Sequence, residues 1–404
     1  MNFEEFNFHP KIAAGIAACG YTTPTPIQKE AIPSILAGKD VFGLAQTGTG
    51  KTAAFVLPLF QRLMKGSRKK ARALIMAPTR ELAEQTHDEI RKMAGKTHLK
   101  SVAIYGGVGK FPQIKAIRAG AEIIVACPGR LLDLFNEGSI NLDHIEVLIL
   151  DEADHMFDKG FLPDIRRIVA QLPKKRQSLV FSATMPLEIR RLAEKILHHP
   201  VTVKINHSRP LATISHALFH VKKEQRTAFL KHLIKKQDMT SAIVFTRTKH
   251  KAKKLAKQLH NSGFSATSLQ GNLTQQNRKK AMDGFRNGTF KILVATDIAA
   301  RGIDVSGISH VINFDLPDTV ETYTHRTGRT GRALKKGQAY SLVGQDDKKM
   351  IALIEKNLGK KISRESLPSF EPERQIPRPK RQPVIISKGA RKRRCLWSES
   401  LAVA

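Results

Sequence analysis

The stretch that decides the fold reads Ala45-Gln46-Thr47-Gly48-Thr49-Gly50-Lys51-Thr52. It follows a short apolar run, Val41–Ala45, and it precedes Ala53–Met64, in which apolar residues recur at helical spacing. A glycine-rich turn between a strand and a helix presents backbone N–H groups and the helix N-terminus to an anion. The stretch therefore predicts a phosphate-binding turn in a parallel α/β fold.

The residues of this turn predict different roles at a nucleotide. We expect the Lys51 ammonium to reach the terminal phosphates and the Thr52 hydroxyl to hold Mg²⁺. Ala45 stands where the general phosphate-loop pattern has its first glycine. The other nucleotide-binding candidates are the remaining turn residues, Gln46, Thr47, Gly48, Thr49 and Gly50.

A second acidic stretch, Asp151-Glu152-Ala153-Asp154, follows the apolar run Val147–Leu150. Asp151 should emerge at the carboxyl end of a central strand, where open α/β sheets bind ligands, and should be a ligand of Mg²⁺. Glu152 is then placed to position and deprotonate an attacking water. The alternative is that these acids only cap the helix expected next.

The sequence predicts an α/β chain of two tandem parallel-sheet domains, because short strands alternate with helical segments in both halves. The 404 residues also exceed the size at which one core stops growing, about 250–300 residues. We place the first domain at residues 1–205, a linker at 206–212, the second domain at 213–366 and a tail at 367–404. Since the second half lacks a Gly-Lys-Thr turn, one nucleotide site per chain is expected.

The charge of the chain points to a polyanionic partner. A formal net charge of +33 and a pI near 10.3 are costly in self-repulsion unless a polyanion is bound. Nucleic acid is the first candidate and an anionic membrane surface the second. From Glu371 onward nine Lys or Arg face three acidic residues, and we expect a disordered tail that tethers RNA or only adds solubility.

Three classes of protein are disfavoured by the sequence. No apolar run approaches the roughly 20 residues that span a bilayer, and the acidic start of the chain has no apolar signal segment. The three cysteines are too scattered for a disulfide frame or a zinc site. We therefore expect a cytoplasmic protein with no membrane partner, and no oligomer is implied.

Asp151-Glu152-Ala153-Asp154, taken with Ser182-Ala183-Thr184, resembles the signature of the DEAD-box RNA helicases. Further motifs of that family follow in order over residues 3–332. The resemblance implies two RecA-like domains, ATP and Mg²⁺ as cofactors, and RNA as partner, free or in ribosomal or mRNA–protein complexes. It implies that ATP hydrolysis at the interdomain cleft drives local unwinding of short RNA duplexes or remodelling of RNA–protein complexes.

An adenine-recognition element is implied by Phe3, Gly20-Tyr21 and Pro24-Thr25-Pro26-Ile27-Gln28. The Gln28 carboxamide can donate to N7 and accept from N6 of adenine at once, and Tyr21 is placed to stack on the base. We therefore expect ATP to be preferred over GTP.

Several loops after strands resemble family segments that grip the sugar-phosphate backbone without reading bases. Glycines there let a backbone approach phosphate closely. Cys127 replaces the usual Thr, so one hydroxyl contact is expected to be missing, and Asn272 replaces a frequent Asp. The RNA-binding candidates are Pro78, Thr79, Arg80, Gly106, Gly107, Pro128, Gly129, Arg130, Thr246, Arg247, Gly271 and Thr296.

The second half is expected to complete the reactive centre. By resemblance Asp304 contacts the ribose of ATP, and Arg329 and Arg332 neutralise charge that develops on the transferred phosphoryl group, an effect of roughly 10³–10⁵ in rate. Together with Glu152 and Lys51 they form the expected catalytic set. A coupling group of Asp154, Ser182, Thr184 and His325 is expected to transmit closure of the domains.

Two other functions stay open at this point. Composition cannot separate RNA from DNA, so a DNA helicase or translocase is the first alternative. An ATP-gated RNA clamp or scaffold is the second, although the presence of Lys51, Glu152, Arg329 and Arg332 favours turnover.

Overall fold

The computed structural model describes residues 2–46, 48–205, 214–237, 239–300, 308–331 and 337–367. The expected linker, the tail beyond Leu367 and the site candidates Thr47, Asp304 and Arg332 lie outside these ranges. Within them, none of the helices combines the length and apolar character that crossing a bilayer requires.

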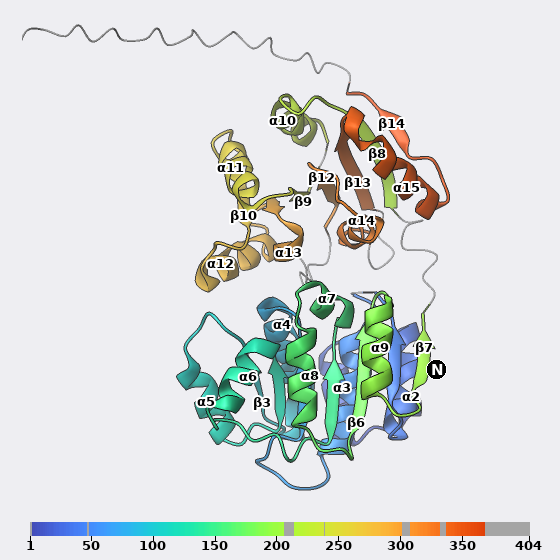
Figure 1. The fold of residues 1–404 in the computed structure, drawn as a ribbon, viewed down its shortest axis with the longest axis vertical. Helices are drawn as coiled ribbons and strands as arrows, with labels where there is room; N and C mark the ends of the chain where they lie inside the picture. Colours follow the sequence, from blue (N-terminus) through green and yellow to red (C-terminus); the bar gives the residue numbers. More distant parts are fainter. Residues whose placement is uncertain are drawn as a thin grey trace, which may run out of the picture. The chain divides into compact units, whose positions relative to one another are not determined.

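The first half is built on a parallel sheet of seven strands, in the order β3-β4-β2-β5-β6-β1-β7 (Figure 1). Most strands are buried along their whole length, as parallel sheets covered on both faces require. The strands are β1 Val41–Leu44, β2 Ala73–Met76, β3 Ser101–Ile104, β4 Ile123–Ala126, β5 Val147–Leu150, β6 Gln177–Ser182 and β7 Val201–Lys204.

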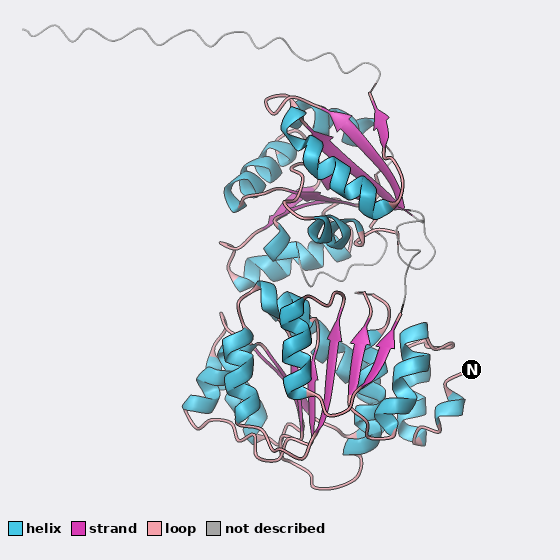
Figure 2. Ribbon diagram, turned by 45° about the vertical axis from the view of Figure 1, so that its right-hand side comes forward, coloured by secondary structure: helices cyan, strands magenta, loops and turns pink. Residues whose placement is uncertain are grey.

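Helices cover both faces of this sheet and form a core on each (Figure 2). Successive side chains of β5 alternate between the cores: Val147 and Ile149 pack into one, Leu148 and Leu150 into the other. The helices are α1 Pro10–Ala18, α2 Pro26–Leu36, α3 Lys51–Leu63, α4 Arg80–Ala94, α5 Lys110–Arg118, α6 Pro128–Asn136, α7 Ala153–Asp158, α8 Leu162–Ala170 and α9 Leu187–Ile196.

The second half repeats this topology in a second parallel sheet, in the order β10-β11-β9-β12-β13-β8-β14. Numbered from its own first strand, the order is identical to that of the first sheet. Its strands are β8 Ile214–His220, β9 Ala242–Phe245, β10 Ala266–Leu269, β11 Ile292–Ala295, β12 His310–Asn313, β13 Gly337–Val343 and β14 Ser363–Glu365. Its helices are α10 Arg226–Lys236, α11 Lys249–His260, α12 Gln275–Arg286, α13 Asp297–Ala300, α14 Val320–Thr327 and α15 Lys348–Leu358.

The predicted fold class, two parallel α/β domains in tandem, is confirmed. The repeat also fixes which positions correspond in the two halves. Lys51 begins α3 after the first strand of its sheet, and Arg226 begins α10 after the first strand of the other. Likewise Glu152 and Asp315 each lie two residues beyond the end of corresponding strands, β5 and β12.

In the second half these corresponding positions form an internal ion pair. Arg226 is only 4% exposed, and its Nη1 lies 3.4 Å from Asp315 Oδ1 and donates to the Phe314 carbonyl oxygen at 3.0 Å. Lys251 Nζ lies 2.5 Å from the same Asp315 oxygen. Arg226, which corresponds to Lys51, therefore pairs with a carboxylate of its own domain and not with a phosphate. This gives a physical reason to expect a single nucleotide site per chain.

We expect Arg226→Ala to destabilise the second half by about 3–5 kcal/mol, because it leaves a buried carboxylate with one cation fewer. Hydrogen–deuterium exchange of the β12 and β13 amides measures the loss. Lys223→Ala is the control, since Lys223 pairs with Asp346 at 3.0 Å but both side chains are exposed, and such pairs contribute about 0–1 kcal/mol. Equal loss of protection in the two variants would contradict a structural role for the buried pair.

Candidate active site and nucleic-acid interface

The phosphate turn joins β1 to α3 in a conformation that requires glycine. Gly48 and Gly50 have positive φ values of 82° and 89°, and a Cβ on Gly50 would lie 2.6 Å from Gln28 Nε2. The Thr49 hydroxyl closes the turn by donating to the Gln46 carbonyl oxygen at 2.8 Å. The turn therefore sits against the N-terminus of α3, where backbone N–H groups are available to an anion.

Lys51 and Asp151 are buried beside this turn with unused polar atoms. Lys51 is 6% exposed and Asp151 is 3% exposed. Among the described residues, neither Lys51 Nζ nor Asp151 Oδ1 has a hydrogen-bond partner. Because unpaired buried polar groups are costly, the pair fits a ligand that carries both negative phosphate oxygens and a cation.

The charge state of Asp151 depends on what lies beside it. Burial raises the pKa of Asp151 to about 7, against the opposing effect of the Lys51 ammonium. A divalent cation would favour the charged carboxylate. The donor set of Asp151 and the Thr52 hydroxyl suits Mg²⁺, which takes few protein ligands and completes its shell with phosphate oxygens and water.

Glu152 is held in a strained backbone conformation, with φ at 55° and ψ at 54°. Non-glycine residues in this left-handed region are concentrated at functional sites. Burial raises its pKa, but the hydrogen bond with His155 and the charges of Lys51, His155 and Arg329 outweigh it and hold the pKa well below its usual range. Glu152 is thus an ionised carboxylate that can accept a hydrogen bond from water.

His155 is a site residue that the sequence reasoning missed. Its Nδ1 lies 3.2 Å from Glu152 Oε2, and both side chains are buried. The available signal was its place three residues after Glu152, since residues i and i+3 face one another at the start of a helix.

Asp154 accepts three hydrogen bonds from the loop after β6. Asp154 Oδ2 accepts from the Thr184 hydroxyl at 2.9 Å and from the Thr184 and Ala183 N–H groups at 2.8 and 3.2 Å. The Ser182 hydroxyl accepts from the Asp154 N–H at 3.2 Å and donates to the Thr184 carbonyl oxygen at 2.7 Å. The loop after β6 is therefore tied to the start of α7.

A cavity of about 240 Å³ brings several predicted residues together. It is lined from the first half by Gln46, Glu152, Asp154, His155 and Thr184, and from the α14 region of the second half by His325 and Arg329. The catalytic and coupling candidates therefore border one cavity, apart from Lys51, Ser182 and the undescribed Arg332.

The proposed adenine element has a further structural role. Gln28 Oε1 accepts from the Thr25 N–H at 2.8 Å, which caps α2, and Gln28 Nε2 donates to the Gly50 carbonyl oxygen at 3.0 Å. Each end of a carboxamide can make one further hydrogen bond, so contact with a base is not blocked. Tyr21 is 37% exposed and its ring stacks on Phe3, with the centroids 6.2 Å apart.

The RNA candidates of the first half follow three neighbouring strands, β3, β4 and β2. A Cβ on Gly107, whose φ is 82°, would lie 2.0 Å from Arg80 Nη1, and Arg130 Nη1 donates to the Val108 carbonyl oxygen at 3.1 Å. The two guanidinium groups therefore lie against the glycine loop. Thr79 caps α4 by accepting from the Leu82 N–H at 3.1 Å. Pro78 and Gly106 lie in the loops after β2 and β3, while Pro128 and Gly129 begin α6.

Cys127 lies at the end of β4, before α6. Burial raises the pKa of its thiol to about 12, which keeps the thiol protonated. A buried thiol is a weak hydrogen-bond donor, in keeping with the expectation that one hydroxyl contact is missing.

The candidates of the second half follow the corresponding strands, β10, β11 and β9. Arg247 is exposed, its Nη2 lies 3.3 Å from Asp318, and its backbone N–H donates to Asp315 at 3.0 Å. Thr246 is buried and donates to the Thr248 carbonyl oxygen at 3.3 Å. Thr296 follows β11 directly, and Gly271 lies two residues after the end of β10, so the four candidates share one edge of the sheet.

Arg326, three residues before Arg329, has a structural role that the sequence did not assign. It is buried, its Nε lies 2.5 Å from Asp297 Oδ1, and its Nη1 donates to Asn313 Oδ1 at 3.0 Å. It ties α14 to the ends of β11 and β12, and so places the start of the following Arg329 segment.

Two family models match the two halves: DEAD/DEAH box helicase over residues 25–192, and helicase conserved C-terminal domain over residues 225–334. The ATP-dependent RNA helicase CshA of Listeria monocytogenes is 41% identical over 371 residues, 91% of this chain and 71% of the relative. CshA of Bacillus subtilis is 40% identical, over 92% of this chain and 75% of the relative.

A solved structure matches both halves together. That of S. cerevisiae Dbp5 bound to RNA and ADP BeF3 has a TM-score of 0.80 at 33% identity, over 90% of this chain and 95% of that chain. With the phosphate turn, the buried Asp-Glu-Ala-Asp stretch and Arg329 on one repeated α/β frame, these matches establish that the chain belongs to the DEAD-box family of ATP-dependent RNA helicases.

Proposed function

We propose that this chain hydrolyses ATP with Mg²⁺ and uses the cycle to open short RNA duplexes or to remodel RNA–protein complexes. The observation that carries the proposal is a pair of buried atoms, Lys51 Nζ and Asp151 Oδ1, which have no hydrogen-bond partner in the described part of the chain and lie beside the strained Glu152. A metal-bound triphosphate would supply phosphate oxygens to the Lys51 ammonium and a cation to the Asp151 carboxylate.

The phosphate turn binds and orients the nucleotide in this proposal. The N–H groups from Gln46 to Thr52 and the Lys51 ammonium hold the phosphates, and Tyr21, Gln28 and Asp304 hold the adenosine. Thr52 and Asp151 would hold Mg²⁺, which neutralises charge on the phosphates when bound.

Glu152 orients the attacking water, because its ionised carboxylate accepts a hydrogen bond from it. His155 holds the Glu152 carboxylate in place by its contact at 3.2 Å. Arg329 and Arg332 supply positive charge to the transferred phosphoryl group. Because these groups come from both halves, hydrolysis requires that the halves close on the nucleotide.

RNA promotes this closure by bridging loops of both halves. Contacts from loop backbones, Arg80, Arg130 and Arg247 recognise the sugar-phosphate chain and leave base identity unread. By linkage, ATP raises the affinity for RNA by the factor by which RNA raises the affinity for ATP. A strand bent into closed halves cannot stay in a straight duplex, so a few base pairs separate locally. The cytoplasm is the compartment we propose for this activity.

The decisive measurement compares ATP turnover without nucleic acid and with single-stranded RNA, duplex RNA and matched DNA. We expect RNA to stimulate turnover, short RNA duplexes to open, and GTP to be hydrolysed more slowly. Lys51→Met is the control that must abolish turnover in every arm. Stimulation by DNA alone would support a DNA helicase, and ATP-dependent RNA binding without turnover would support a clamp.

Removing the His155 contact should slow the chemical step. We expect His155→Ala to lower kcat by about 10–100-fold with little change in KM for ATP, because a hydrogen bond to a charged group contributes about 1.5–3 kcal/mol. His155→Asn is the matched variant, since its amide can donate from nearly the same place. If His155→Asn loses as much activity as His155→Ala while both variants stay folded, the positioning role is wrong.

The Asp154 cluster should couple turnover to strand separation. We expect Ser182→Ala combined with Thr184→Ala to retain RNA-stimulated turnover in part but to lose duplex unwinding. A control that also removes two hydroxyls, Ser262→Ala with Thr289→Ala, changes exposed sites whose hydroxyls bond only to Gln258 and Asn287 nearby. Normal unwinding by the Ser182 and Thr184 double variant would refute the coupling role.

A further inference from the structure

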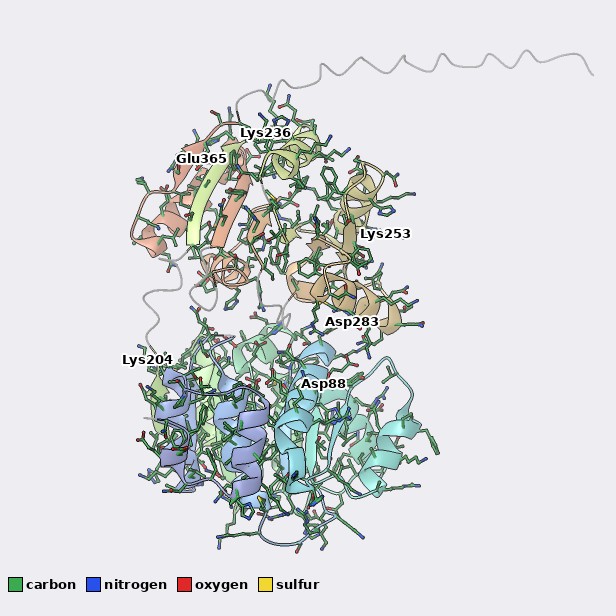
Figure 3. All side chains as sticks on the ribbon, turned by 180° about the vertical axis from the view of Figure 1, so that it is seen from behind. Asp88, Lys204, Lys236, Lys253, Asp283 and Glu365 are labelled. Atoms are coloured by element: carbon green, nitrogen blue, oxygen red, sulfur yellow. The ribbon has the colours of Figure 1, made fainter. Side chains whose placement is uncertain are left out.

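Residues 222–280 form a strongly basic part of the second half. They contain fifteen Lys or Arg and only two acidic residues, Glu224 and Asp238. The two helices α10 and α11 lie within this part, and Figure 3 labels Lys236 on α10 and Lys253 on α11. The chain moves in the same direction along the sheet from β8 to β9 and from β9 to β10, so right-handed crossovers place both helices on one face.

Helix α11 carries a row of exposed lysines. Lys249, Lys253 and Lys257 recur every four residues, about 6 Å apart along the helix, and Lys254 lies beside them. All four are exposed, whereas Leu255 and Leu259 on the opposite side are buried. We call Lys249, Lys253, Lys254 and Lys257 the lysine row.

The lysine row is not balanced by acidic neighbours. No residue of α11 is acidic, and among the described residues no carboxylate lies within ion-pair distance of Lys253, Lys254 or Lys257. Lys249 Nζ donates to a neutral amide oxygen, Asn272 Oδ1, at 3.1 Å. Lys251 differs from the row, since it points inward to Asp315 at 2.5 Å.

This arrangement costs the isolated protein stability. Like charges four residues apart on a helix destabilise it by about 0.2–0.5 kcal/mol per pair. Helix α11 begins with Lys249, and a cation at a helix N-terminus opposes the helix dipole. A solvated surface helix gains nothing from that placement, whereas a bound polyanion would offset both costs.

The lysine row begins where the RNA contacts of the second half are proposed. Thr248 caps α11 by accepting from the Lys251 N–H at 3.3 Å, and Thr246 and Arg247 directly precede it. The row therefore leads away from those contacts along a helix of 12 residues, which is about 18 Å long.

We propose that the lysine row binds the phosphates of RNA that continues past Thr246 and Arg247, outside the contacts that couple to ATP. The inference rests on the proposed function, since it takes RNA to pass those two residues. The row from Lys249 to Lys257 spans about 12 Å along the helix, so at about 3.4 Å per stacked nucleotide it accommodates about three to four nucleotides. The contact is electrostatic, independent of base sequence and sensitive to salt.

The test measures how much a flanking extension tightens RNA binding. The full chain is titrated with a short single-stranded RNA and with the same RNA extended by about five nucleotides at its 5′ or its 3′ end. We compare the wild type with Lys253→Gln, Lys254→Gln and Lys257→Gln combined. Glutamine removes the charge and keeps a similar helix propensity.

We expect the extension at one end to tighten binding to the wild type, and the triple variant to lose that gain. For three phosphate contacts to a single strand, the slope of log affinity against log salt should become shallower by about 2. The matched control combines Lys349→Gln, Lys356→Gln and Lys360→Gln, which removes the same charge from exposed positions on and just after α15. This control should keep the gain in RNA affinity that the extension gives to the wild type. Thermal melting checks that both variants stay folded.

Three outcomes would overturn the proposal: a triple variant that keeps the full gain, equal losses in the variant and the control, or no gain in the wild type from either extension. Failure of the proposed function would look different. In that case the wild type would bind the short RNA no better with ATP present, and RNA would not stimulate turnover.

Discussion

The whole arrangement depends on how each half neutralises a buried carboxylate at the carboxyl edge of its sheet. A charge removed from water must be paired or must shift its pKa. In the first half Asp151 and Glu152 lie close to Lys51, but Lys51 Nζ and Asp151 Oδ1 make no hydrogen bond within the described residues. A ligand that carries both phosphate oxygens and a cation would pair these two buried groups. The groups that fit the nucleotide are therefore also those that the fold leaves without a hydrogen bond.

The second half meets the same requirement with its own side chains. Asp315 is paired with Arg226 and Lys251 and also accepts the Arg247 N–H. Since the two sheets have the same strand order, the difference lies in the cations at the edge. In the second half Arg226 takes the position of Lys51 and reaches the Asp315 carboxylate directly, and no glycine-rich turn precedes it.

The sequence predicted the features that depend on local pattern. Buried parallel strands read as apolar runs, and a glycine-rich turn between a strand and a helix indicates an anion site, so the two sheets, the phosphate turn and the acidic strand end were accessible. Features that depend on a contact with a residue far along the chain could not be predicted from the sequence. Gln28 braces Gly50 across 22 residues, and Arg326 binds Asp297 across 29. A carboxamide or an arginine looks the same in a sequence whether it faces a ligand or another part of the fold.

The ion pairs also explain where the excess positive charge of the chain is found. Most acidic residues described in the second half form ion pairs near strand ends or on the surface. Asp297 pairs with Arg326, Asp315 pairs with Arg226 and Lys251, and Glu355 pairs with Arg364. The outer faces of α10 and α11 are left with lysines and no acids. Screening by salt weakens repulsion among such exposed cations, and it weakens their attraction to RNA phosphates as well. Salt should therefore change RNA affinity far more than it changes the stability of the fold, because the pairs that hold the strand ends together are buried.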